Sequence, residues 1–305
     1  MIKVHRLSKV YGTTWALRDL TLEIEKGDMF GLIGPNGAGK TTLIKILATL
    51  LKPTSGLAMI DGLPVETGGD RVRKAIGYLP DFFGVYEDMR VREYLEFFAS
   101  TYGIRNPERR RIIDGVLELT DLGGKKEAII GTLSRGMQQR LGLARVLVHD
   151  PKVLLLDEPA SGLDPRARIE IRALLKELRR MGKTILISSH ILADLADLCN
   201  KIGLIERGKL LYAGDLQKAM DMVQSDQWIV EVADDTEKAV ELLRANTSAR
   251  SIEAKEGQIL IQMNGTEPYL IPQVLHQNGL RLRSFRREEV TLEEAFLKLT
   301  KGEVS

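Results

Sequence analysis

Short apolar runs and longer segments with helical spacing alternate through the first two thirds of the chain. The continuous apolar runs predict parallel strands buried on both faces, and the segments between them predict amphipathic helices. The strand segments are 29–34, 152–157 and 184–190, and the helical segments are 40–51 and 165–182. This alternation predicts an α/β domain over residues 1–215, ending in a hairpin that turns at Arg207 and Gly208.

The pattern changes after a polar connector, or short helix, at residues 216–225. From residue 226 to 285 the segments follow the order strand, helix, strand, strand, helix, strand, which is that of a ferredoxin-like α+β domain. A final helical segment begins near Thr291, and Glu294 three residues later completes the spacing of a capping box. We therefore expect a C-terminal accessory or dimerisation domain over residues 226–305.

Composition limits the class of protein. The chain has 305 residues, of which 44% are hydrophobic and 28% charged, and this is typical of a globular protein with two domains. The formal net charge is only +2, so we expect no broad basic face for nucleic acid.

No apolar run approaches the roughly 20 residues that a membrane-spanning helix needs, and the first residues show no signal-peptide pattern. Any work at a membrane would therefore pass through a partner chain. The single cysteine, Cys199, permits no internal disulfide, and we expect it to pack in a helix rather than act as a nucleophile.

A phosphate-binding motif follows the first of these buried strands. The segment GPNGAGKTT matches the pattern G-x-x-x-x-G-K-[ST], in which glycines let backbone amides point toward a β-phosphate. Lys40 would supply positive charge to the β- and γ-phosphates, and the Thr41 hydroxyl would bind Mg²⁺. A glycine-rich turn before an ordinary helix is the simpler alternative, but the preceding strand and following helix favour nucleotide binding. The predicted nucleotide-binding residues here are Gly34, Pro35, Asn36, Gly37, Ala38, Gly39, Lys40, Thr41 and Thr42.

Two adjacent carboxylates follow the apolar residues of the LLLDEP segment. We expect Asp157 to hold Mg²⁺, directly or through water, and Glu158 to orient or deprotonate an attacking water. An acidic strand exit is common in α/β folds, but its presence beside a phosphate loop favours the catalytic interpretation. His190 ends the next strand, where it can reach a γ-phosphate, although a lone histidine is more often a satisfied polar residue. The predicted catalytic residues are Lys40, Glu158 and His190.

A second helix start with anion-binding character lies at residues 131–147, GTLSRGMQQRLGLARVL. A serine and a glycine stand where this amphipathic helix begins, and the oriented amides of a helix start suit an anion. The sequence therefore predicts two phosphate-binding helix starts in one chain.

Together these motifs resemble those of the ATP-binding subunit of an ABC transporter over residues 1–215. In that family LSRGM corresponds to the signature motif, SGLD to the D-loop and the histidine after ILISS to the switch histidine. The signature residues are Leu133, Ser134, Arg135, Gly136 and Met137, and the D-loop residues are Ser161, Gly162, Leu163 and Asp164. The resemblance implies a P-loop NTPase fold with a helical subdomain over residues 82–150, ATP and Mg²⁺ as cofactors, and ATPase activity.

The resemblance also implies why one chain carries two such helix starts. In this family two ATP-binding subunits pair head to tail, so the signature of one closes on the ATP held by the other. ATP would then hold together a dimer, which we expect to be a homodimer, and hydrolysis would let it open. Tyr11 matches the adenine-stacking aromatic of the family, although a single tyrosine can also be a packed residue.

Two positions depart from the family pattern. The signature is usually LSGGQ, and here Arg135 and Met137 replace a glycine and the glutamine, while Ser134 and Gly136 remain for phosphate contacts. The residue after YLP is Asp81, where the family usually has a glutamine that reaches Mg²⁺ and water. We hypothesise that Asp81 still reaches the metal.

Aromatic residues gather after the YLP segment. Three have helical spacing, which favours core packing, and these are Tyr94, Phe97 and Phe98. Three others lie in a loop, where exposed aromatics are typical interface anchors, and these are Phe82, Phe83 and Tyr86. In the resembled family this region binds a short cytoplasmic helix of the membrane subunit, so we expect the loop aromatics to contact a permease.

The resulting hypothesis is an ATPase subunit on the cytoplasmic face of the cell membrane that powers export through separate permease subunits. The segment VTLEEAFLKLT resembles the end of ATPases that serve drug, polysaccharide and lipid exporters, although a domain that only stabilises a dimer explains it equally well. A soluble ABC ATPase acting on ribosomes or nucleic acid is the main alternative, but such proteins usually join two cassettes or carry a coiled coil or zinc-binding insert. An importer ATPase stays open as a third hypothesis.

Overall fold

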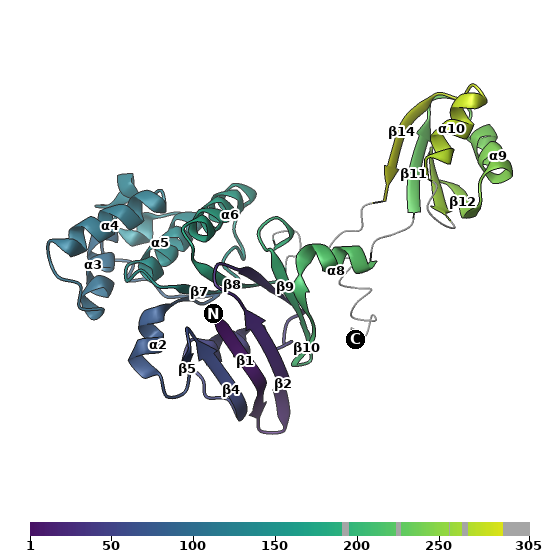
Figure 1. Ribbon diagram of the computed structural model, residues 1–305. Coiled ribbons are helices and arrows are strands. Elements are labelled where there is room, and N and C mark those ends of the chain that lie inside the picture. The colour runs from purple at the N-terminus through teal and green to yellow at the C-terminus, as the bar shows by residue number, and fades with distance from the viewer. Residues whose placement is uncertain (191–194, 224–226, 256, 264–267, 289–305) are drawn as a thin grey trace. The chain divides into compact units, whose positions relative to one another are not determined.

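The computed structural model describes residues 1–190, 195–223, 227–255, 257–263 and 268–288 (Figure 1). The chain divides into two compact units, the first covering Met1–Lys218 and the second beginning at Ala219. The predicted final helix, with Thr291 and Glu294, lies outside the described residues. None of the helices within the described ranges is long and apolar enough to cross a bilayer.

A six-stranded sheet forms the centre of the first unit, with the strand order β10-β9-β3-β8-β7-β6. Its parallel strands are β3 (Met29–Ile33), β6 (Ile76–Leu79), β7 (Val153–Asp157), β8 (Thr184–Ser189) and β9 (Lys201–Glu206), and the antiparallel edge strand is β10 (Lys209–Asp215). Every residue of β3, β7 and β8 is buried, which confirms the strands predicted from continuous apolar runs. The hairpin of β9 and β10 is also confirmed, and Arg207 and Gly208 at its turn both have positive φ.

A second, antiparallel sheet packs beside the first, and the sequence analysis did not separate it. Its strands are β1 (Ile2–Tyr11), β2 (Thr14–Ile24), β4 (Ser55–Ile60) and β5 (Leu63–Pro64), in the order β2-β1-β4-β5. The helices α1 (Lys40–Leu47) and α2 (Gly69–Ala75) belong to the same part of the chain. One hydrophobic cluster joins side chains of both sheets with those of α1, so α1 and the loop before it rest on a continuous core.

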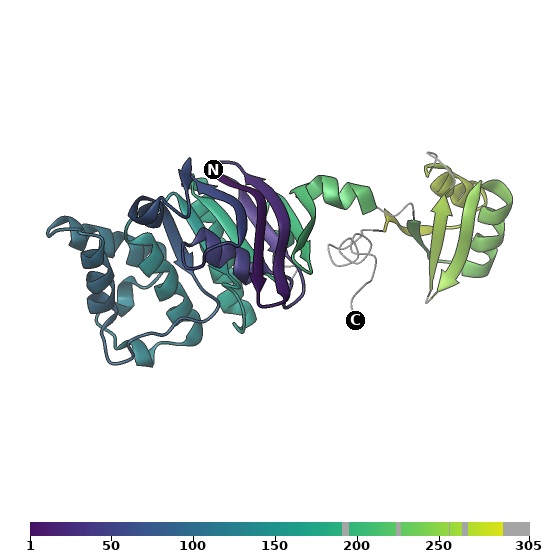
Figure 2. The ribbon, with the colours of Figure 1, turned by 90° about the horizontal axis from the view of Figure 1, so that it is seen from below.

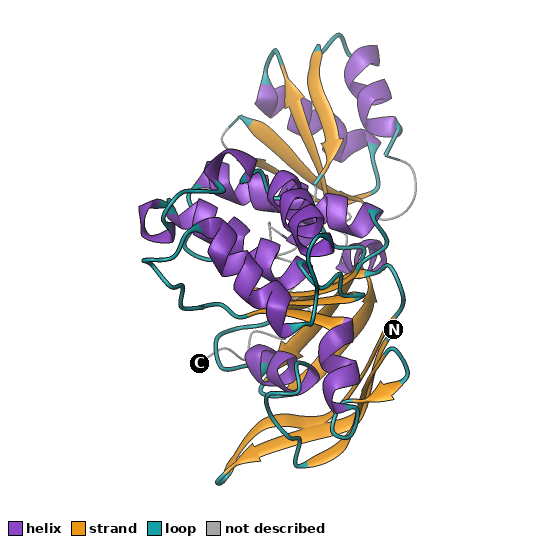
Figure 3. Ribbon diagram, turned by 90° about the vertical axis from the view of Figure 1, so that its left-hand side faces the viewer, coloured by secondary structure: helices purple, strands orange, loops and turns teal. Residues whose placement is uncertain are grey.

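A group of helices separates β6 from β7 in the chain and lies to one side of the sheets (Figure 1, Figure 3). These are α3 (Val91–Thr101), α4 (Glu108–Leu119) and α5 (Arg135–Leu147), with the short 3₁₀ turns η1 (Gly123–Lys125) and η2 (Ile130–Thr132) before α5. After β7 comes α6 (Pro165–Arg180), which packs against α5. Helix α6 begins with proline and is followed by Gly182 with φ 84°, as its sequence predicts.

The second unit contains one antiparallel sheet with the strand order β12-β13-β11-β14. Its elements follow α8 (Leu216–Val223) in the order β11 (Gln227–Val232), α9 (Thr236–Asn246), β12 (Ala249–Lys255), β13 (Gln258–Met263), α10 (Leu270–Gln277) and β14 (Leu282–Arg287). Both α9 and α10 cover one face of the sheet, where Leu243 and Leu275 meet Val230 and Ile261 in a separate core (Figure 2). This order of strands and helices is the one that the sequence pattern predicts.

Candidate functional site

The loop between β3 and α1 is shaped by contacts that only glycine permits. A Cβ atom at Gly34 would lie 2.2 Å from the carbonyl oxygen of Ile205. Gly39 has φ 111°, and a Cβ there would lie 2.5 Å from the carbonyl oxygen of Ala16. No side chain caps the start of α1, so the first amides of the helix point into the loop without a side-chain acceptor. The result is a cradle of backbone donors, which is the environment a phosphate needs.

Lys40, the first residue of α1, is buried within this loop, with only 6% of its surface exposed. Its Nζ donates to the carbonyl oxygens of Gly34 at 2.6 Å and Pro35 at 3.2 Å, and lies 3.9 Å from Oε1 of Glu158. Burial lowers the pKa of Lys40 from its ordinary value, while the nearby carboxylates of Glu158 and Asp157 oppose that change. The ammonium group therefore faces a site in which a further anion would be favourable.

Two carboxylates stand where β7 ends. Asp157 is buried, and its Oδ1 accepts a 2.5 Å hydrogen bond from the Ser188 hydroxyl, because β7 and β8 pair these two residues in register. The Glu158 backbone has φ 50° and donates its N–H to the Ser188 carbonyl and hydroxyl oxygens. That left-handed turn is sparsely populated by residues other than glycine, and it aims the side chain back across the strand ends.

Glu158 connects the two other residues predicted to act in catalysis. Its Oε2 lies 2.7 Å from Nδ1 of His190, while its Oε1 faces Lys40. The carboxylate is mostly buried, whereas the His190 side chain is about half exposed. The structure thus brings together Lys40 at the start of α1, Glu158 just after β7 and His190 just after β8.

A pocket of about 200 Å³ opens at this point. It is lined by Ala16, Pro35, Asn36, Gly37, Ala38, Gly39, Lys40, Thr41, Thr42, Asp81 and Glu158. Thus Asp81, which is exposed, joins the phosphate loop and the carboxylate of Glu158 around one cavity. Tyr11 is not part of this lining; it is half exposed near the end of β1, with the Lys9 ammonium 5.1 Å from its ring centre.

The polar groups in and beside the pocket fit a magnesium ion that arrives with a nucleotide. No cluster of three or more His, Cys, Asp or Glu side chains that could hold a metal occurs among the described residues. Mg²⁺ commonly uses only one or two carboxylate or hydroxyl groups of the protein and completes its shell with phosphate oxygens and water. Thr41 lines the pocket, and the buried Asp157 precedes Glu158 just outside the lining. These two predicted metal-binding groups fit that requirement.

Comparison with known proteins identifies the family. The family model described as ABC transporter matches residues 17–161. A bacitracin transport ATP-binding protein of Bacillus licheniformis is 34% identical over 304 residues, which cover 99% of this chain and 98% of that protein. This chain belongs to the ABC transporter ATP-binding family. Its first unit is an ABC ATPase.

Other relatives of this ABC ATPase extend the comparison. A Nod factor export ATP-binding protein I of Cupriavidus pinatubonensis is 33% identical over 307 residues, covering 100% of this chain and 92% of that protein. An uncharacterised ABC transporter ATP-binding protein of Synechocystis is 38% identical over 230 residues, which span 72% of this chain but only 64% of the relative. Among solved structures, a dimeric ATP-binding cassette in a post-hydrolysis state, bound to ADP and Pi, has a TM-score of 0.64 at 27% identity, covering 71% and 99% of the two chains. These comparisons do not favour the soluble alternative.

The predicted signature of this ABC ATPase lies at the start of α5, outside the phosphate pocket. Ser134 caps the helix, and its hydroxyl accepts the backbone N–H of Met137 at 3.3 Å. Leu133 is buried, whereas Ser134 and Arg135 are exposed. None of residues 133–137 lines the pocket, so the two helix starts predicted to bind phosphate do not share this pocket within one chain.

The predicted D-loop, residues 161–164, lies in the turn between β7 and α6. Asp164 caps α6 and accepts the backbone N–H of Ala167 at 2.9 Å, and Leu163 is buried. Gly162 has φ 64°, which favours glycine. Like the signature, this segment lies outside the pocket lining.

The aromatic residues of the loop after β6 divide into two kinds. Phe82 has 88% of its surface exposed, and Tyr86 is exposed as well. Phe83 instead packs inward, since a Cβ at Gly142 of α5 would lie 2.4 Å from its ring. On α3, Tyr94 is fully buried, as its spacing predicts, but Phe97 is exposed, which the core interpretation did not anticipate.

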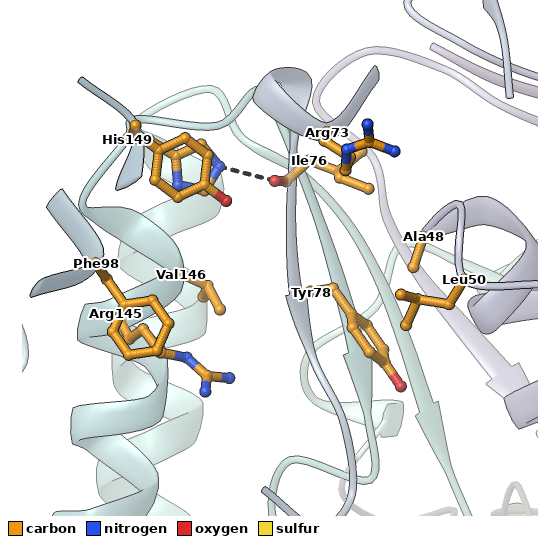
Figure 4. A pocket seen from close by; sticks show the side chains of 10 residues that line it. Ala48, Leu50, Arg73, Ile76, Tyr78, Phe98, Arg145, Val146 and His149 are labelled. Atoms are coloured by element: carbon orange, nitrogen blue, oxygen red, sulfur yellow. Dashed lines mark hydrogen bonds between the residues drawn. The ribbon is translucent and has the colours of Figure 1, made fainter. Parts of the chain in front are cut away.

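A second pocket, of about 230 Å³, lies between the helices and the central sheet (Figure 4). Phe98, Arg145, Val146 and His149 lie on one side, and Tyr78, Leu50 and Ala48 face them across the cavity. None of its ten lining residues is acidic. His149 stacks on Tyr102, and its Nε2 lies 2.8 Å from the carbonyl oxygen of Ile76.

Sequence reasoning missed Ser188 and Ala16. Ser188 holds the Asp157 carboxylate, and Ala16 supplies a wall of the phosphate pocket. A signal for Ser188 was present, because a serine two residues before His190 on a parallel neighbour of β7 can reach the end of that strand. Ala16 comes from the antiparallel sheet, and no local pattern links it to the phosphate loop.

Proposed function

We propose that this chain hydrolyses ATP to power the export of a substrate through separate membrane-spanning subunits. Two relatives that align with nearly the whole chain carry the names Nod factor export and bacitracin transport ATP-binding protein, which supports a transporter role. The proposed working form is a pair of ATP-binding subunits, identical in the simplest case, on the cytoplasmic face of the cell membrane. No nucleic acid is among the expected partners.

One observation carries this proposal: Glu158 lies between Lys40 and His190 at the edge of the phosphate pocket. Lys40 and the amides of the loop would bind the β- and γ-phosphates. Glu158 would orient a water for attack on the γ-phosphate and accept its proton, while His190 holds the carboxylate in place and reaches toward the same phosphate. Positioning and charge stabilisation of this kind supply most of the catalysis in phosphoryl transfer.

Mg²⁺ would neutralise charge on the β- and γ-phosphate oxygens when bound. The Thr41 hydroxyl and Asp157 are the proposed ligands, and Ser188 keeps the Asp157 carboxylate oriented. Asp81 lines the same pocket, which supports a role in reaching the metal or its water, in place of the glutamine usual in the family. Tyr11 remains a proposed adenine contact, made at the rim rather than in the pocket.

Pairing of two copies would complete each reaction centre. The signature residues 133–137 and the D-loop residues 161–164 lie away from the pocket of their own chain, so they are free to face the nucleotide of a partner. Ser134 and the amide of Gly136 are the proposed phosphate contacts in that arrangement. ATP between the two copies would add charge-assisted hydrogen bonds to an interface that is otherwise wet.

The loop aromatics are the proposed contact with a permease. Phe82 and Tyr86 are exposed enough to act as anchors. Phe83 would instead hold the loop against Gly142 of α5 and contact a partner only with part of its ring. Arg145, which lines the second pocket (Figure 4), lies with its guanidinium 5.1 Å from the centre of the Phe83 ring and so connects that pocket to the loop.

The proposed organisation is an ABC ATP-binding domain over residues 1–215, with a helical subdomain over 82–150, a connector over 216–225 and an accessory domain over 226–305. The order β12-β13-β11-β14 and the β-α-β-β-α-β succession support a ferredoxin-like fold for the last domain. Its role would be to regulate or stabilise the dimer.

The variant Glu158→Gln tests the proposed reaction. We expect kcat for ATP hydrolysis to fall by at least about 100-fold, because the carboxamide cannot accept the proton from water. Since bound ATP would then persist, size-exclusion chromatography with light scattering should show a dimer with MgATP and a monomer with MgADP. The matched control is Glu177→Gln on α6, which should keep full activity.

Retention of activity in Glu158→Gln would contradict the catalytic role. A strictly monomeric protein at high concentration with MgATP, even beside its membrane partner, would contradict the dimer.

A further inference from the structure

The Arg135 guanidinium lies on the D-loop of its own chain. A Cβ atom at Gly162 would lie 2.4 to 2.7 Å from three guanidinium atoms of Arg135, so the arginine fills the space above that glycine. Gly162 has φ 64°, and the absence of a side chain there serves both the turn and the close approach of Arg135. The contact joins the first residue of α5 to the turn between β7 and α6.

The first turns of α5 and α6 also touch. A Cβ at Gly136 would lie 2.8 Å from the Cβ of Ala167, so the two helices meet at van der Waals distance one residue after Arg135. This contact fixes the separation of the starts of α5 and α6, and so the distance from the Arg135 backbone to Gly162. The signature and the D-loop are therefore neighbours within one chain, although neither lines the phosphate pocket.

The turn under Arg135 leads directly back to Glu158. The N–H of Ser161 donates to the carbonyl oxygen of Glu158 at 3.0 Å, and that of Leu163 donates to Ala160 at 3.4 Å. Apart from these bonds, the Arg168 side chain donates to the Leu163 carbonyl oxygen at 3.0 Å. A shift of the backbone at Gly162 would therefore also move the backbone of Glu158, four residues earlier, whose φ of 50° is strained.

Arg135 has no carboxylate partner that would explain its position. It is exposed, and its side chain takes part in no ion pair or hydrogen bond with the described part of the chain. A guanidinium group is flat and weakly hydrated on its faces, so it can lie on a peptide plane in a way that an ammonium group cannot. The contact with Gly162 is the interaction that fixes the side chain.

We propose that Arg135 is a positioning residue that holds the D-loop, and through it Glu158, in register with the start of α5. The residue that breaks the usual signature pattern would thereby link the second helix start to the catalytic carboxylate of the same chain. This inference rests on the proposed ATPase function, but it concerns a contact between two residues of the same chain.

Three variants of the full chain test the proposal. We expect Arg135→Ala to lower kcat for ATP hydrolysis by about tenfold with KM for ATP nearly unchanged, because misplacement of a catalytic group affects the reaction more than binding at the phosphate loop. Arg135→Lys should be as slow as Arg135→Ala, since lysine keeps the charge but lacks the flat group. The matched control is Arg166→Ala, which removes an exposed arginine at the start of α6 that pairs with Glu170 and does not reach Gly162.

Hydrogen–deuterium exchange without nucleotide gives a readout that is independent of catalysis. The amides of residues 160–164 should exchange faster in Arg135→Ala and Arg135→Lys than in wild type or Arg166→Ala. If the wild-type chain hydrolyses no ATP, the proposed function fails, and the exchange experiment still decides this inference.

Two results would overturn it. Unchanged exchange in Arg135→Ala would show that the contact does not hold the D-loop. Recovery of kcat in Arg135→Lys would show that charge, as in direct contact with a phosphate, is what matters.

Discussion

The starts of α1 and α5 both present backbone amides that suit an anion, but they differ in capping and in exposure. At α1 no side chain caps the helix, Lys40 is buried, and the loop encloses the free amides in a pocket. At α5 the Ser134 hydroxyl already accepts an N–H of the first turn, and the helix start is exposed. The first encloses a cradle for phosphate within one chain. The second, under the proposed function, would bind a phosphate only when a partner molecule brings it.

Loss of Lys40 should have the largest effect, because it removes the cation from the cradle at α1. We expect Lys40→Ala to lower ATPase activity by about 1000-fold and to weaken nucleotide binding, since the phosphates would lose a buried positive charge. Fluorescent ATP-analogue binding and steady-state kinetics measure both effects. Lys45→Ala, later on the same helix, is the control, and equal loss in that variant would refute a specific role for Lys40.

Loss of the Ser134 hydroxyl should have a smaller effect of a different kind. Ser134→Ala should leave ATP binding to the dilute monomer unchanged and lower kcat by about tenfold at protein concentrations where dimers form. Unfolding in urea should show a loss of about 1 kcal/mol from the missing cap. If nucleotide binding to the monomer fell as strongly as activity, the two helix starts would not be distinct in the way described.

Substitution of Asp81 tests whether this pocket residue contributes to the metal site beside α1. We expect Asp81→Ala to lower kcat by a few-fold to about tenfold and to raise the Mg²⁺ concentration needed for half-maximal activity, because one pocket carboxylate is lost. Asp81→Gln, which restores the residue usual in the family, should recover most of the activity. An unchanged Mg²⁺ dependence in the alanine variant would remove Asp81 from the metal site.

The smallest expected effect is on the pH dependence of stability, and it comes from His149, two residues after the end of α5. Burial lowers the pKa of His149 from 6.5, so between that value and its folded pKa the unfolded chain binds a proton that the folded chain does not. Stability contributed by the neutral imidazole is therefore full above pH 6.5 and is lost as the pH falls through the folded pKa. Replacing His149 with Gln should make the free energy of unfolding in urea less dependent on pH below 6.5. An identical pH profile in both proteins would contradict this.

Sequence patterns predicted the parts of the fold that depend on neighbours in the chain. The continuous apolar runs gave β3, β7 and β8, and the spacing of the phosphate loop and of Glu158 placed both at strand ends. The strand that carries Ala16 pairs only with distant segments, so its place in a separate sheet had no local signal.

The prediction of exposed loop aromatics holds for Phe82 and Tyr86, but sequence reasoning did not single out Phe83 as the one that packs inward. Phe82 and Phe83 are adjacent phenylalanines, yet Phe82 faces solvent and Phe83 packs on Gly142. The reason is that Gly142, on a helix about 60 residues further along the chain, has no side chain and leaves room for the Phe83 ring. The contact of Arg135 with Gly162 has the same origin. Such placement depends on tertiary packing, which no short motif encodes.

The surroundings of Cys199 make the chain convenient for spectroscopy. This thiol is the only one in the sequence, it packs against Gly31, and burial raises its pKa to about 12. Maleimide reagents attack thiolates, so the wild-type protein should stay unlabelled while folded. A cysteine introduced at an exposed position would then carry a fluorophore or spin label without any need to replace the native one.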